Sequence, residues 1–403
     1  MQQEIIKAAI DDIDGLPPSE ISKLDLIPPF HGRPYAKGTE LYTNEGWKEV
    51  QLLSCNEMFL SPNPNNNLGL EWVGAKRLIK HDPKGFMYEF KSQNFHLLVD
   101  KEHSQIYSTQ PYSKGRWKIG EAQELTKFAK IYIPRECKWA GENKPFIHVG
   151  KYRLSTRLFV QFMAFWLSDG SVAKRGSNSY QISIANTKNN SRIFNIVKQL
   201  PFKVRRTAAK IEFNDTTIGK YLIKFGHAHS KCIPEEIKQL TSEYLKIFLE
   251  SYLICDGHIQ NRNGSKIVKS SNCSPARVFY TTSRRLADDI GECILKTDGY
   301  PSYIMQYQAG TKRVIKGHRM NCNHDIHRIY WNRSKAATFG PQGKGTITKV
   351  PYLGMAYCIE LKKSHGLLVR YNGKVCISMN CRCQIVSMGA VGGPRVPSIP
   401  KRR

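Results

Sequence analysis

An asparagine followed directly by a cysteine closes an apolar, β-prone run over residues 375–379. The side-chain amide of Asn380 can attack its own backbone carbonyl and close a succinimide, which breaks the peptide bond that follows. Cys381 supplies a thiol, an intrinsically strong nucleophile. Together the two residues could break one peptide bond and carry an acyl group across the break. The alternative from the local sequence is a strand that ends in a polar turn.

Two apolar segments, 162–170 and 249–257, each end in an Asp-Gly pair. Small residues four apart give each segment a flat helical face: Ala164 and Ser168 in the first, Ser251 and Cys255 in the second. Two such helices packed side by side would bring Asp169 and Asp256 together. Paired carboxylates suit a hard divalent cation such as Mg²⁺, which can support phosphodiester hydrolysis. The alternative is that each Asp-Gly pair merely ends a helix.

The chain has 403 residues and a formal net charge of +28. Its hydrophobic share of 40% predicts a folded chain of two or three domains, so the charge indicates a polyanionic partner, most often nucleic acid. No apolar run reaches membrane-spanning length, which excludes a membrane-spanning protein class. Eleven cysteines at irregular spacings, without a signal peptide, predict reduced thiols in a cytoplasm.

β character appears near both ends of the chain. Strands are predicted at 38–43, 48–53, 72–73, 86–90 and 95–99, with a hairpin turn at 44–47. This all-β module runs to about Leu125. β character returns at 356–361, 366–370 and 374–378, with Asn372-Gly373 as a hairpin turn. The first 33 residues predict a short helix at 3–13 and a Pro-rich tail, and the last 23 drift into a Gly/Pro/Arg tail.

The middle of the chain, about 151–308, repeats one pattern of helix, strand, helix and basic segment. The members of the two copies are helices at 158–167 and 245–254, strands at 180–184 and 278–281, and second helices at 191–200 and 283–295. We interpret residues 312–344 as a basic linker.

The two acidic helices resemble the motif helices of LAGLIDADG (dodecapeptide) homing endonucleases, over about residues 151–310. The run Lys231-Cys232-Ile233-Pro234 resembles the Lys-x-Ile-Pro block that precedes the second motif helix, and 280–300 resembles the late block. This resemblance implies Mg²⁺-dependent, site-specific cleavage of double-stranded DNA, with Asp169 and Asp256 as metal ligands. It also implies that Lys231 lies near the scissile phosphate; the alternative is a solvated surface lysine. Leu167 and Ile254 depart from the motif by replacing its inner acidic residue.

By the same resemblance, the strands of each repeat form a curved sheet in the DNA major groove. Basic residues beside the sheets are then expected to contact phosphates: Lys203, Arg205, Arg206, Lys210, Arg284 and Arg285. A DNA-binding protein without cleavage activity is an alternative, in which the two aspartates are structural. A further group could bind zinc, although its spacing fits no standard finger and a basic DNA-facing loop is preferred: His318, Cys322, His324 and His327.

The two β-rich ends resemble the halves of an intein's splicing (Hint) domain. Residues 38–47 resemble its first block, and 99–103 resemble its Thr-x-x-His block, with Asp100 in the Thr position and His103 as the histidine. Residues 357–369 and 374–381 resemble the last two blocks. The order of the four blocks implies an all-β splicing domain split by an α/β (α+β) endonuclease with two pseudo-symmetric αββαββα-type repeats.

This organisation predicts the following segments. Residues 1–33 and 381–403 are flanking exteins, 34–130 and 336–380 are the halves of the splicing domain, and 131–335 is the endonuclease with its linkers, its repeats at about 151–240 and 241–310. The joined flanks resemble the His-x-x-Cys-Arg-Cys signature of phage Mu-type head-morphogenesis (minor capsid) proteins. A monomer encoded by a phage or prophage, in the cytoplasm of a bacterial host, is expected.

Two positions depart from the usual splicing pattern. Pro34 stands where a Cys or Ser nucleophile usually begins the intein, so we hypothesise that Cys381 attacks the Arg33 carbonyl directly. The Arg33–Pro34 bond is a tertiary amide with a weaker trans preference than other peptide bonds. His103 is the candidate acid for the departing nitrogen.

Met379 replaces the usual penultimate histidine, so His365 is expected to assist the cyclisation of Asn380. Cys358 is an alternative relay nucleophile, although the tryptophan that such a relay needs is replaced by Gln105. An inactive splicing domain beside a working endonuclease is a further alternative.

Overall fold

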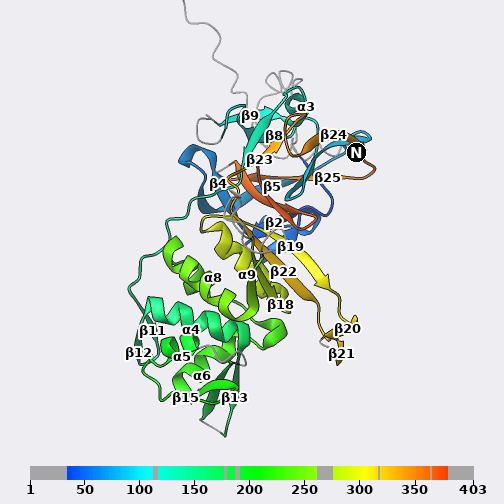
Figure 1. Cartoon of the computed structure of the whole chain (residues 1–403). Coiled ribbons are helices and arrows are strands. Elements are labelled where there is room, and N and C mark those ends of the chain that lie inside the picture. Colours follow the sequence, from blue (N-terminus) through cyan, green and yellow to red (C-terminus); the bar gives the residue numbers. More distant parts are fainter. Residues whose placement is uncertain are drawn as a thin grey trace, which may run out of the picture.

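The computed structural model describes residues 34–379 apart from 112–116, 177–178, 187–190, 261–275, 316–317 and 364. Figure 1 shows a sheet-rich part that contains both ends of the described chain, and a mixed α/β part formed by its middle. The expected flanks, the helix at 3–13, Asn380 and Cys381 lie outside the described residues. No helix of the described residues is long and apolar enough to cross a membrane.

The sheet-rich part interleaves strands from the two ends of the chain. Strand β1 (Tyr35–Ala36) lies between β7 (Phe95–Val99) and β25 (Ala356–Leu361) and pairs antiparallel with both. The long strand β5 (Gly69–His81) pairs with β25 on its other side. The first and last segments of the described chain therefore form one sheet.

A second contact between the ends is made by β2 (Glu40–Thr43), which pairs with β26 (Gly366–Tyr371). Strand β27 (Lys374–Met379) pairs with β26 through a turn at Asn372 and Gly373, both with positive φ, of 47° and 71°. This is the left-handed geometry that an Asn-Gly hairpin turn adopts, so the turn predicted from the sequence is confirmed.

The remaining elements of this part come mostly from the N-terminal segment: β3 (Gly46–Glu49), β4 (Met58–Asn63), β6 (Phe86–Ser92), β8 (Ser104–Tyr107), β9 (Lys118–Glu121), α3 (Ala122–Leu125) and β24 (Thr346–Pro351). The return strand expected at 48–53 ends earlier, because Val50–Leu52 form a 3₁₀ turn. The Val50 amide donates to the Thr39 carbonyl (2.7 Å), which turns the chain out of the strand.

Two strands next to the α/β part complete the core of the sheet-rich part. β10 (Ile131–Pro134) pairs antiparallel with β23 (Ala336–Phe339). The Phe339 ring is fully buried and meets the rings of Phe90 and Phe95 edge-on, at centroid distances of 5.7 and 5.0 Å. Burial of each aromatic ring contributes about 2 kcal/mol or more, so both strands are tied to this core.

The α/β part begins with the hairpin β11 (Phe146–Val149) and β12 (Tyr152–Ser155). The first repeat then comprises α4 (Thr156–Asp169), β13 (Gly170–Lys174), β14 (Tyr180–Ala185), α5 (Ser191–Val197), β15 (Arg205–Arg206), β16 (Lys210–Asn214) and α6 (Thr216–Leu222). The second comprises α8 (Ser242–Asp256), β17 (Gly257–Gln260), β18 (Ala276–Thr281), α9 (Arg284–Leu295), β19 (Tyr300–Tyr307) and β22 (Ile326–Asn332), preceded by α7 (Glu235–Lys238).

The sheets of the two repeats have the same topology. The strand order is β13-β14-β16-β15 in the first and β17-β18-β22-β19 in the second. In each sheet the last strand in sequence lies between the two strands before it. β16 lies between β14 and β15, and β22 lies between β18 and β19. The internal repeat inferred from sequence thus recurs in the order of the strands.

The basic linker expected at 312–344 is wrong for most of its length. This segment forms β20 (Lys312–Ile315), β21 (His318–Asn321), β22 and β23, and β22 lies inside the sheet of the second repeat. In β22 the apolar Ile329 and Trp331 alternate with Arg328 and Tyr330, and the first two are buried. The basic residues hid a period-two pattern that indicates a strand.

Helices α4 and α8 pack side by side in the middle of the α/β part (Figure 1). Their small residues Ala164, Ser251 and Cys255 are buried, as the expected close approach requires. The hydroxyls of Ser168 and Ser251 donate to carbonyls one turn back in their own helices, at 3.0 and 2.7 Å, and so do not remain unsatisfied in the interface.

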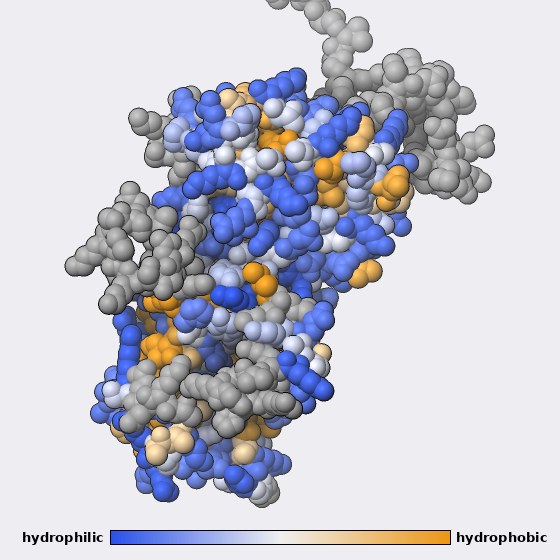
Figure 2. Space-filling view, turned by 45° about the vertical axis from the view of Figure 1, so that its right-hand side comes forward, coloured by the Kyte–Doolittle hydropathy of each residue, from blue (hydrophilic) through white to orange (hydrophobic). Residues whose placement is uncertain are grey.

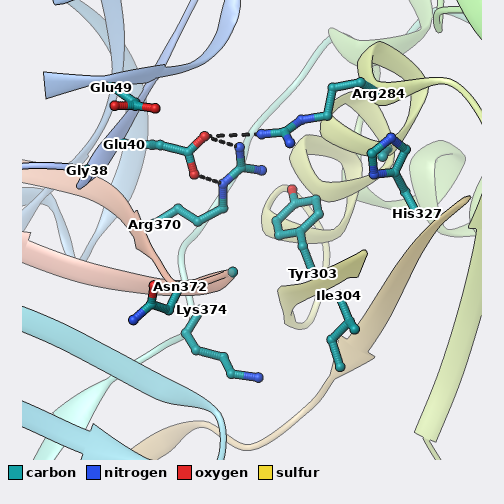
Figure 3. Close-up of a pocket in the computed structure, with 12 residues that line it drawn as sticks. Gly38, Glu40, Glu49, Arg284, Tyr303, Ile304, His327, Arg370, Asn372 and Lys374 are labelled. Atoms are coloured by element: carbon teal, nitrogen blue, oxygen red, sulfur yellow. Dashed lines mark hydrogen bonds and ion pairs between the residues drawn. The ribbon is translucent and has the colours of Figure 1, made fainter. Parts of the chain in front are cut away.

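The two parts are joined by a charge ring of Glu40, Arg284, Asp288 and Arg370. Arg370 from β26 pairs with Glu40 of β2 and, at 2.8 Å, with Asp288 of α9, while Arg284 pairs with Glu40 and Asp288 at 3.1 and 3.3 Å. Figure 3 shows Arg370 and Arg284 converging on Glu40 at a cavity of about 570 Å³ between the parts. Arg370 is 2% exposed, so this contact is fixed rather than transient.

A second buried contact lies beside the ring. The Tyr42 hydroxyl of β2 donates to Glu292 of α9 (2.6 Å), which also accepts from Lys238 and Lys296. Burial opposes ionisation of Glu292, but the two ammonium groups lower its pKa to about 2. Sheet pairing of Ser302 with Lys374 adds a third link, so the α/β part is attached to the sheet-rich part at several points.

Replacing Ala164 with leucine is expected to lower the free energy of unfolding by about 1–3 kcal/mol, because the buried face of α4 has no room for the added carbons. Urea unfolding followed by tryptophan fluorescence measures the change. Ala185→Leu makes the same substitution at an exposed position of β14. Equal stabilities of the two variants would contradict the close packing of α4.

Candidate functional sites

The two aspartates singled out by the sequence are the last residues of α4 and α8. Each helix passes directly into a strand through a glycine. A Cβ on Gly170 would lie 2.5 Å from the Trp166 carbonyl oxygen, and one on Gly257 would lie 2.9 Å from the Val278 carbonyl oxygen. Glycine is therefore required at both exits, and both carboxylates are held at the same end of a packed helix pair.

Lys231 is buried between these helix ends. Its ammonium donates to the carbonyls of Trp166 (2.7 Å), Leu167 (3.1 Å) and Gly170 (2.8 Å). The ammonium thus lies at the carboxyl end of α4 and the start of β13, where the partial negative charge of a helix end favours a cation. All three N–H donors are used, so in this structure Lys231 caps a helix, and its contact with a phosphate stays a prediction.

Lys231 also interacts electrostatically with both carboxylates. Burial lowers the pKa of Lys231 to about 8, while the charges of Asp256 and Asp169 act in the opposite direction. Both aspartates are thus close enough to the Lys231 ammonium to affect its pKa. The alternative of a solvated surface lysine is wrong, because the residue is 4% exposed.

Asp169 and Asp256, called the helix-end pair from here on, offer carboxylate oxygens that suit a hard divalent cation. Two partly exposed carboxylates at the ends of packed helices leave coordination positions for water and phosphate oxygens, which Mg²⁺ retains readily. No group of three or more His, Cys, Asp or Glu side chains that could hold a metal occurs among the described residues. A cation here would therefore be shared with a bound oxyanion rather than enclosed by protein.

The zinc site suggested by the sequence is not formed by those of its residues whose side chains the structure describes. Cys322, His324 and His327 do not converge, and the side chain of His318 lies outside the description. The ring of His324 instead stacks on that of His229, with centroids 4.5 Å apart. His327 is buried beside the cavity of Figure 3.

The basic residues predicted to contact DNA fall into two groups. Arg205 and Arg206 form β15, the edge strand of the first sheet, and Lys210 begins β16 beside it. Lys203 is exposed just before them. Arg284 and Arg285 instead lie on α9 at the junction of the two parts, and Arg285 pairs with Asp289 (3.2 Å). The structure does not bring these two groups together, and phosphate contacts by any of them remain predictions.

Sequence reasoning missed a polar and aromatic surface on the second sheet. His258 stacks on Tyr280 (5.6 Å between centroids), and the Arg328 guanidinium lies 4.7 Å from the ring centre of Tyr330. Stacked aromatic and guanidinium groups suit nucleic-acid bases and phosphates. The alternation in β22 was the signal that could have revealed them. Figure 2 shows a mainly hydrophilic surface on both parts of the molecule.

A second candidate site lies where the two ends of the described chain meet. Pro34 is buried, and its carbonyl accepts from the Asp100 amide (3.1 Å). The next residue, Tyr35, donates its hydroxyl to the Met379 carbonyl (2.5 Å). Met379 directly precedes Asn380. The predicted N-terminal junction and the strand that leads to the predicted C-terminal junction are therefore one hydrogen bond apart.

His103 lies within this site. Its ring meets the Tyr35 ring edge-on at 4.8 Å, and its Nε2 is 2.8 Å from the hydroxyl of Ser378. Ser378 in turn bonds to Gln105, whose amide donates to the Ile377 carbonyl (2.8 Å). His103, Ser378 and Gln105 are all at most 2% exposed. The histidine is thus packed between both predicted junctions.

Asp100, expected in place of a threonine, is also buried at this site. Burial raises the pKa of its carboxyl, although it accepts from the Glu102 amide (3.1 Å). One carboxylate oxygen lies 3.6 Å from Nε2 of His81 at the end of β5. His81 was not identified from sequence, because nothing local connects it with residue 100.

The two remaining splicing candidates flank the junctions. Cys358 is 1% exposed and follows Tyr357, the partner of Tyr35 in the sheet. His365 precedes Gly366, which pairs with Met379. Each candidate therefore lies beside one end of the described chain. Burial of Cys358 does not favour a reactive thiolate. The eight cysteines of the described residues are free, as expected for reduced thiols.

Comparison with known proteins finds no matching family model. A DNA-directed RNA polymerase subunit beta C-terminal section from Stigeoclonium helveticum is 23% identical over 83% of this chain and 35% of its own length. An ATP-dependent Clp protease proteolytic subunit from Chlamydomonas moewusii is 20% identical over 72% of this chain and 30% of its own. The chain spans about a third of each of these relatives.

Solved structures with local likeness include an AceL NrdHF class 3 split intein, with 18% identity and a TM-score of 0.23 over 30% of this chain and 71% of that one. A variant of I-DmoI in complex with its target DNA has 9% identity and a TM-score of 0.29, covering 44% and 89%. The DNA-bound homing endonuclease I-WcaI has 15% identity and a TM-score of 0.27, covering 45% and 77%. Superpositions of this size do not establish a shared fold.

The lowered pKa of Lys231 gives a pH test. Between about 8 and the ordinary value of 10.5 the unfolded chain binds a proton that the folded chain lacks, so the contribution of Lys231 to stability rises with pH. We expect the free energy of unfolding of the wild-type chain, relative to Lys231→Met, to increase across this window in urea titrations with EDTA present. The exposed control Lys203→Met should give no such slope, and a flat difference for Lys231→Met would contradict its burial.

Proposed function

We propose that this chain is a self-splicing intein with an embedded LAGLIDADG-type homing endonuclease. Splicing would join Arg33 to Cys381, and the endonuclease would cut double-stranded DNA at one site. The observation that carries the proposal is the meeting of the two ends of the described residues, through the bond from the Tyr35 hydroxyl to the Met379 carbonyl. An inserted segment can excise itself only when its two junctions share one active site.

The splicing chemistry follows from the absence of a nucleophile at Pro34. The Cys381 thiolate attacks the Arg33 carbonyl, the carbonyl carbon–Pro34 nitrogen bond breaks, and His103 delivers a proton to the leaving nitrogen. Arg33 is then held as a thioester on Cys381. Asn380 cyclises with assistance from His365 and releases the intein, and the new amino group of Cys381 displaces its own sulfur to give an ordinary peptide bond. The edge-on contact of the His103 ring with the Tyr35 ring supports this role for His103.

The endonuclease proposal rests on the helix-end pair. Asp169 and Asp256 would hold Mg²⁺, which supplies charge neutralisation at the phosphate and a more acidic bound water. The two similar sheets, with His258, Tyr280 and Arg328 on one of them, would lie along the DNA. A net charge of +28 supports binding to a polyanion.

The two relatives support a modular insertion. A polymerase subunit and a protease subunit have different named activities, yet each matches more than half of this chain, so the two matches overlap here. A segment shared in this way is most simply an insert carried within different hosts. Neither relative is named as a head-morphogenesis protein, and that host, the monomeric state and a cytoplasmic bacterial setting stay predictions.

Two further functions have specific observations in their favour. Pro34 and Met379 favour an endonuclease with an inactive splicing domain. Full use of the Lys231 donors in capping α4 favours a DNA-binding protein in which the helix ends are structural. The two tests below separate these functions from the proposed one.

Intact-mass analysis of the purified full-length chain tests splicing. We expect a free segment of residues 34–380 together with the joined flanks, and only precursor for Cys381→Ala. His103→Ala should slow release by about 100-fold or more, because a positioned acid contributes about 10²–10⁴-fold. Unprocessed precursor from the wild-type chain would leave the inactive splicing domain as the better account.

DNA cleavage tests the helix-end pair. A DNA that encodes the joined His-Gly-Arg-Cys-Arg-Cys segment should be cut in the presence of Mg²⁺, and Asp169→Asn or Asp256→Asn should reduce the rate about 100-fold or more while leaving binding in place. Asp298→Asn, at an exposed ion pair with Lys246, is the matched control. Binding without cleavage by the wild-type chain would favour the structural role of the two aspartates.

A further inference from the structure

His103, Ser378, Gln105 and the Ile377 carbonyl form a series of hydrogen bonds. The donor and acceptor in each bond can be assigned by starting from the Ile377 carbonyl. The Gln105 side-chain nitrogen lies 2.8 Å from the Ile377 carbonyl oxygen. A carbonyl can only accept, so the group facing it must be the amide NH₂. This contact fixes the orientation of the amide and turns its oxygen, Oε1, toward Ser378.

The next link follows from the single hydrogen of a serine hydroxyl. Ser378 Oγ lies 3.2 Å from Gln105 Oε1 and 2.8 Å from His103 Nε2. Oε1 is an acceptor, so the hydroxyl donates its hydrogen to it. The Ser378 oxygen then has only lone pairs to offer to His103, and Nε2 must carry the hydrogen that lies between them.

We propose that Ser378 and Gln105 are positioning residues that hold neutral His103 as the Nε2–H tautomer. The basic nitrogen is then Nδ1, on the side of the ring away from Ser378. This inference rests on the proposed splicing function for its purpose: Nδ1 is the atom that collects a proton and delivers it to the Pro34 nitrogen. Neither Ser378 nor Gln105 reacts.

The hydrogen-bonded residues are closed off from solvent. His103 and Gln105 are fully buried and Ser378 is 0% exposed, so bulk water does not compete for these bonds. In such a site the wrong tautomer would set two acceptors against each other, at 2.8 or 3.2 Å. An unmatched buried polar contact of this kind is enough to select one tautomer by about fivefold or more.

This series of hydrogen bonds also links the two predicted junctions. Ile377 and Ser378 both belong to β27, the strand that leads to Asn380, whereas His103 and Gln105 follow the segment that faces Pro34. The tautomer that serves the first junction is therefore held as the single form only when the strand of the second junction is in place. Proton transfer at Pro34 would then be fastest in a complete splicing core.

Within the proposed reaction the proton balance is closed. Neutral Nδ1 takes the proton of the Cys381 thiol, and the resulting thiolate attacks the Arg33 carbonyl. The imidazolium, which keeps its Nε2–H bond to Ser378, returns the proton from Nδ1 to the Pro34 nitrogen as the carbon–nitrogen bond breaks. His103 ends neutral and in its starting tautomer.

Nitrogen-15 NMR of His103 tests the proposal directly. The full chain carrying Asn380→Ala and Cys381→Ala stays intact as precursor, and at a pH where the ring is neutral we expect a hydrogen on Nε2 and a lone pair on Nδ1. Adding Ser378→Ala should yield a mixture of tautomers, while Ser378→Thr, which keeps the hydroxyl, should retain the original one. A hydrogen on Nδ1 in the parent chain would overturn the proposal.

Splicing rates give a second readout, with a matched control. Ser61→Ala also removes a buried hydroxyl that donates to a backbone carbonyl, at Gly366. In the otherwise unchanged chain, Ser378→Ala should slow release from Pro34 about tenfold more than Ser61→Ala, and Ser378→Thr should restore the rate to within about twofold. Equal rates for Ser378→Ala and Ser61→Ala would contradict a positioning role for Ser378.

The outcomes separate this inference from the function it serves. The Nε2–H tautomer in a wild-type chain that never splices would support the hydrogen-bond chain and reject the proposed function. Active splicing with the hydrogen on Nδ1 would do the reverse.

Discussion

The position of β1 between β7 and β25 is the constraint on which the rest of the structure depends. Tyr35 pairs on one side with Val99 and on the other with Tyr357, from opposite ends of the described sequence, and Ala36 pairs with Ala356. Neither end can form its sheet without the other. The consequence is local and chemical: Pro34, His103 and Met379 are held within one buried site, although the whole α/β part lies between them in sequence.

The same arrangement explains why the large α/β part does not disturb that site. The α/β part leaves the sheet-rich part after β10 and returns at β23, and these two strands pair with each other. Its connection is then reinforced by the charge ring of Glu40, Arg284, Asp288 and Arg370. Arg284 is largely exposed, so its two pairs contribute little, whereas the buried pair of Arg370 with Asp288 fixes one relative arrangement, since breaking it leaves an unpaired buried charge.

Local patterns in the sequence predicted those features that depend on neighbours along the chain. The Asn372-Gly373 turn followed from its dipeptide, and α4 and α8 followed from apolar runs that end in Asp-Gly. What was missed depends on distant contacts. Basic residues on one face of β22 resembled a linker. Lys231 was expected near a phosphate, but its ammonium donates to two carbonyls of α4 and to the carbonyl of Gly170 in β13. His81 and Ser378 acquire their partners only through the sheet.

The central claim is that the two junction peptide bonds lie in one active site. A crystal structure of the full chain carrying Asn380→Ala and Cys381→Ser measures this most directly, because the precursor then keeps both junctions. The account predicts the hydroxyl oxygen at position 381 about 3.5 Å from the Arg33 carbonyl carbon, with His103 beside the Pro34 nitrogen. Junctions on separate faces of the sheet-rich part, more than about twice that distance apart, would contradict it.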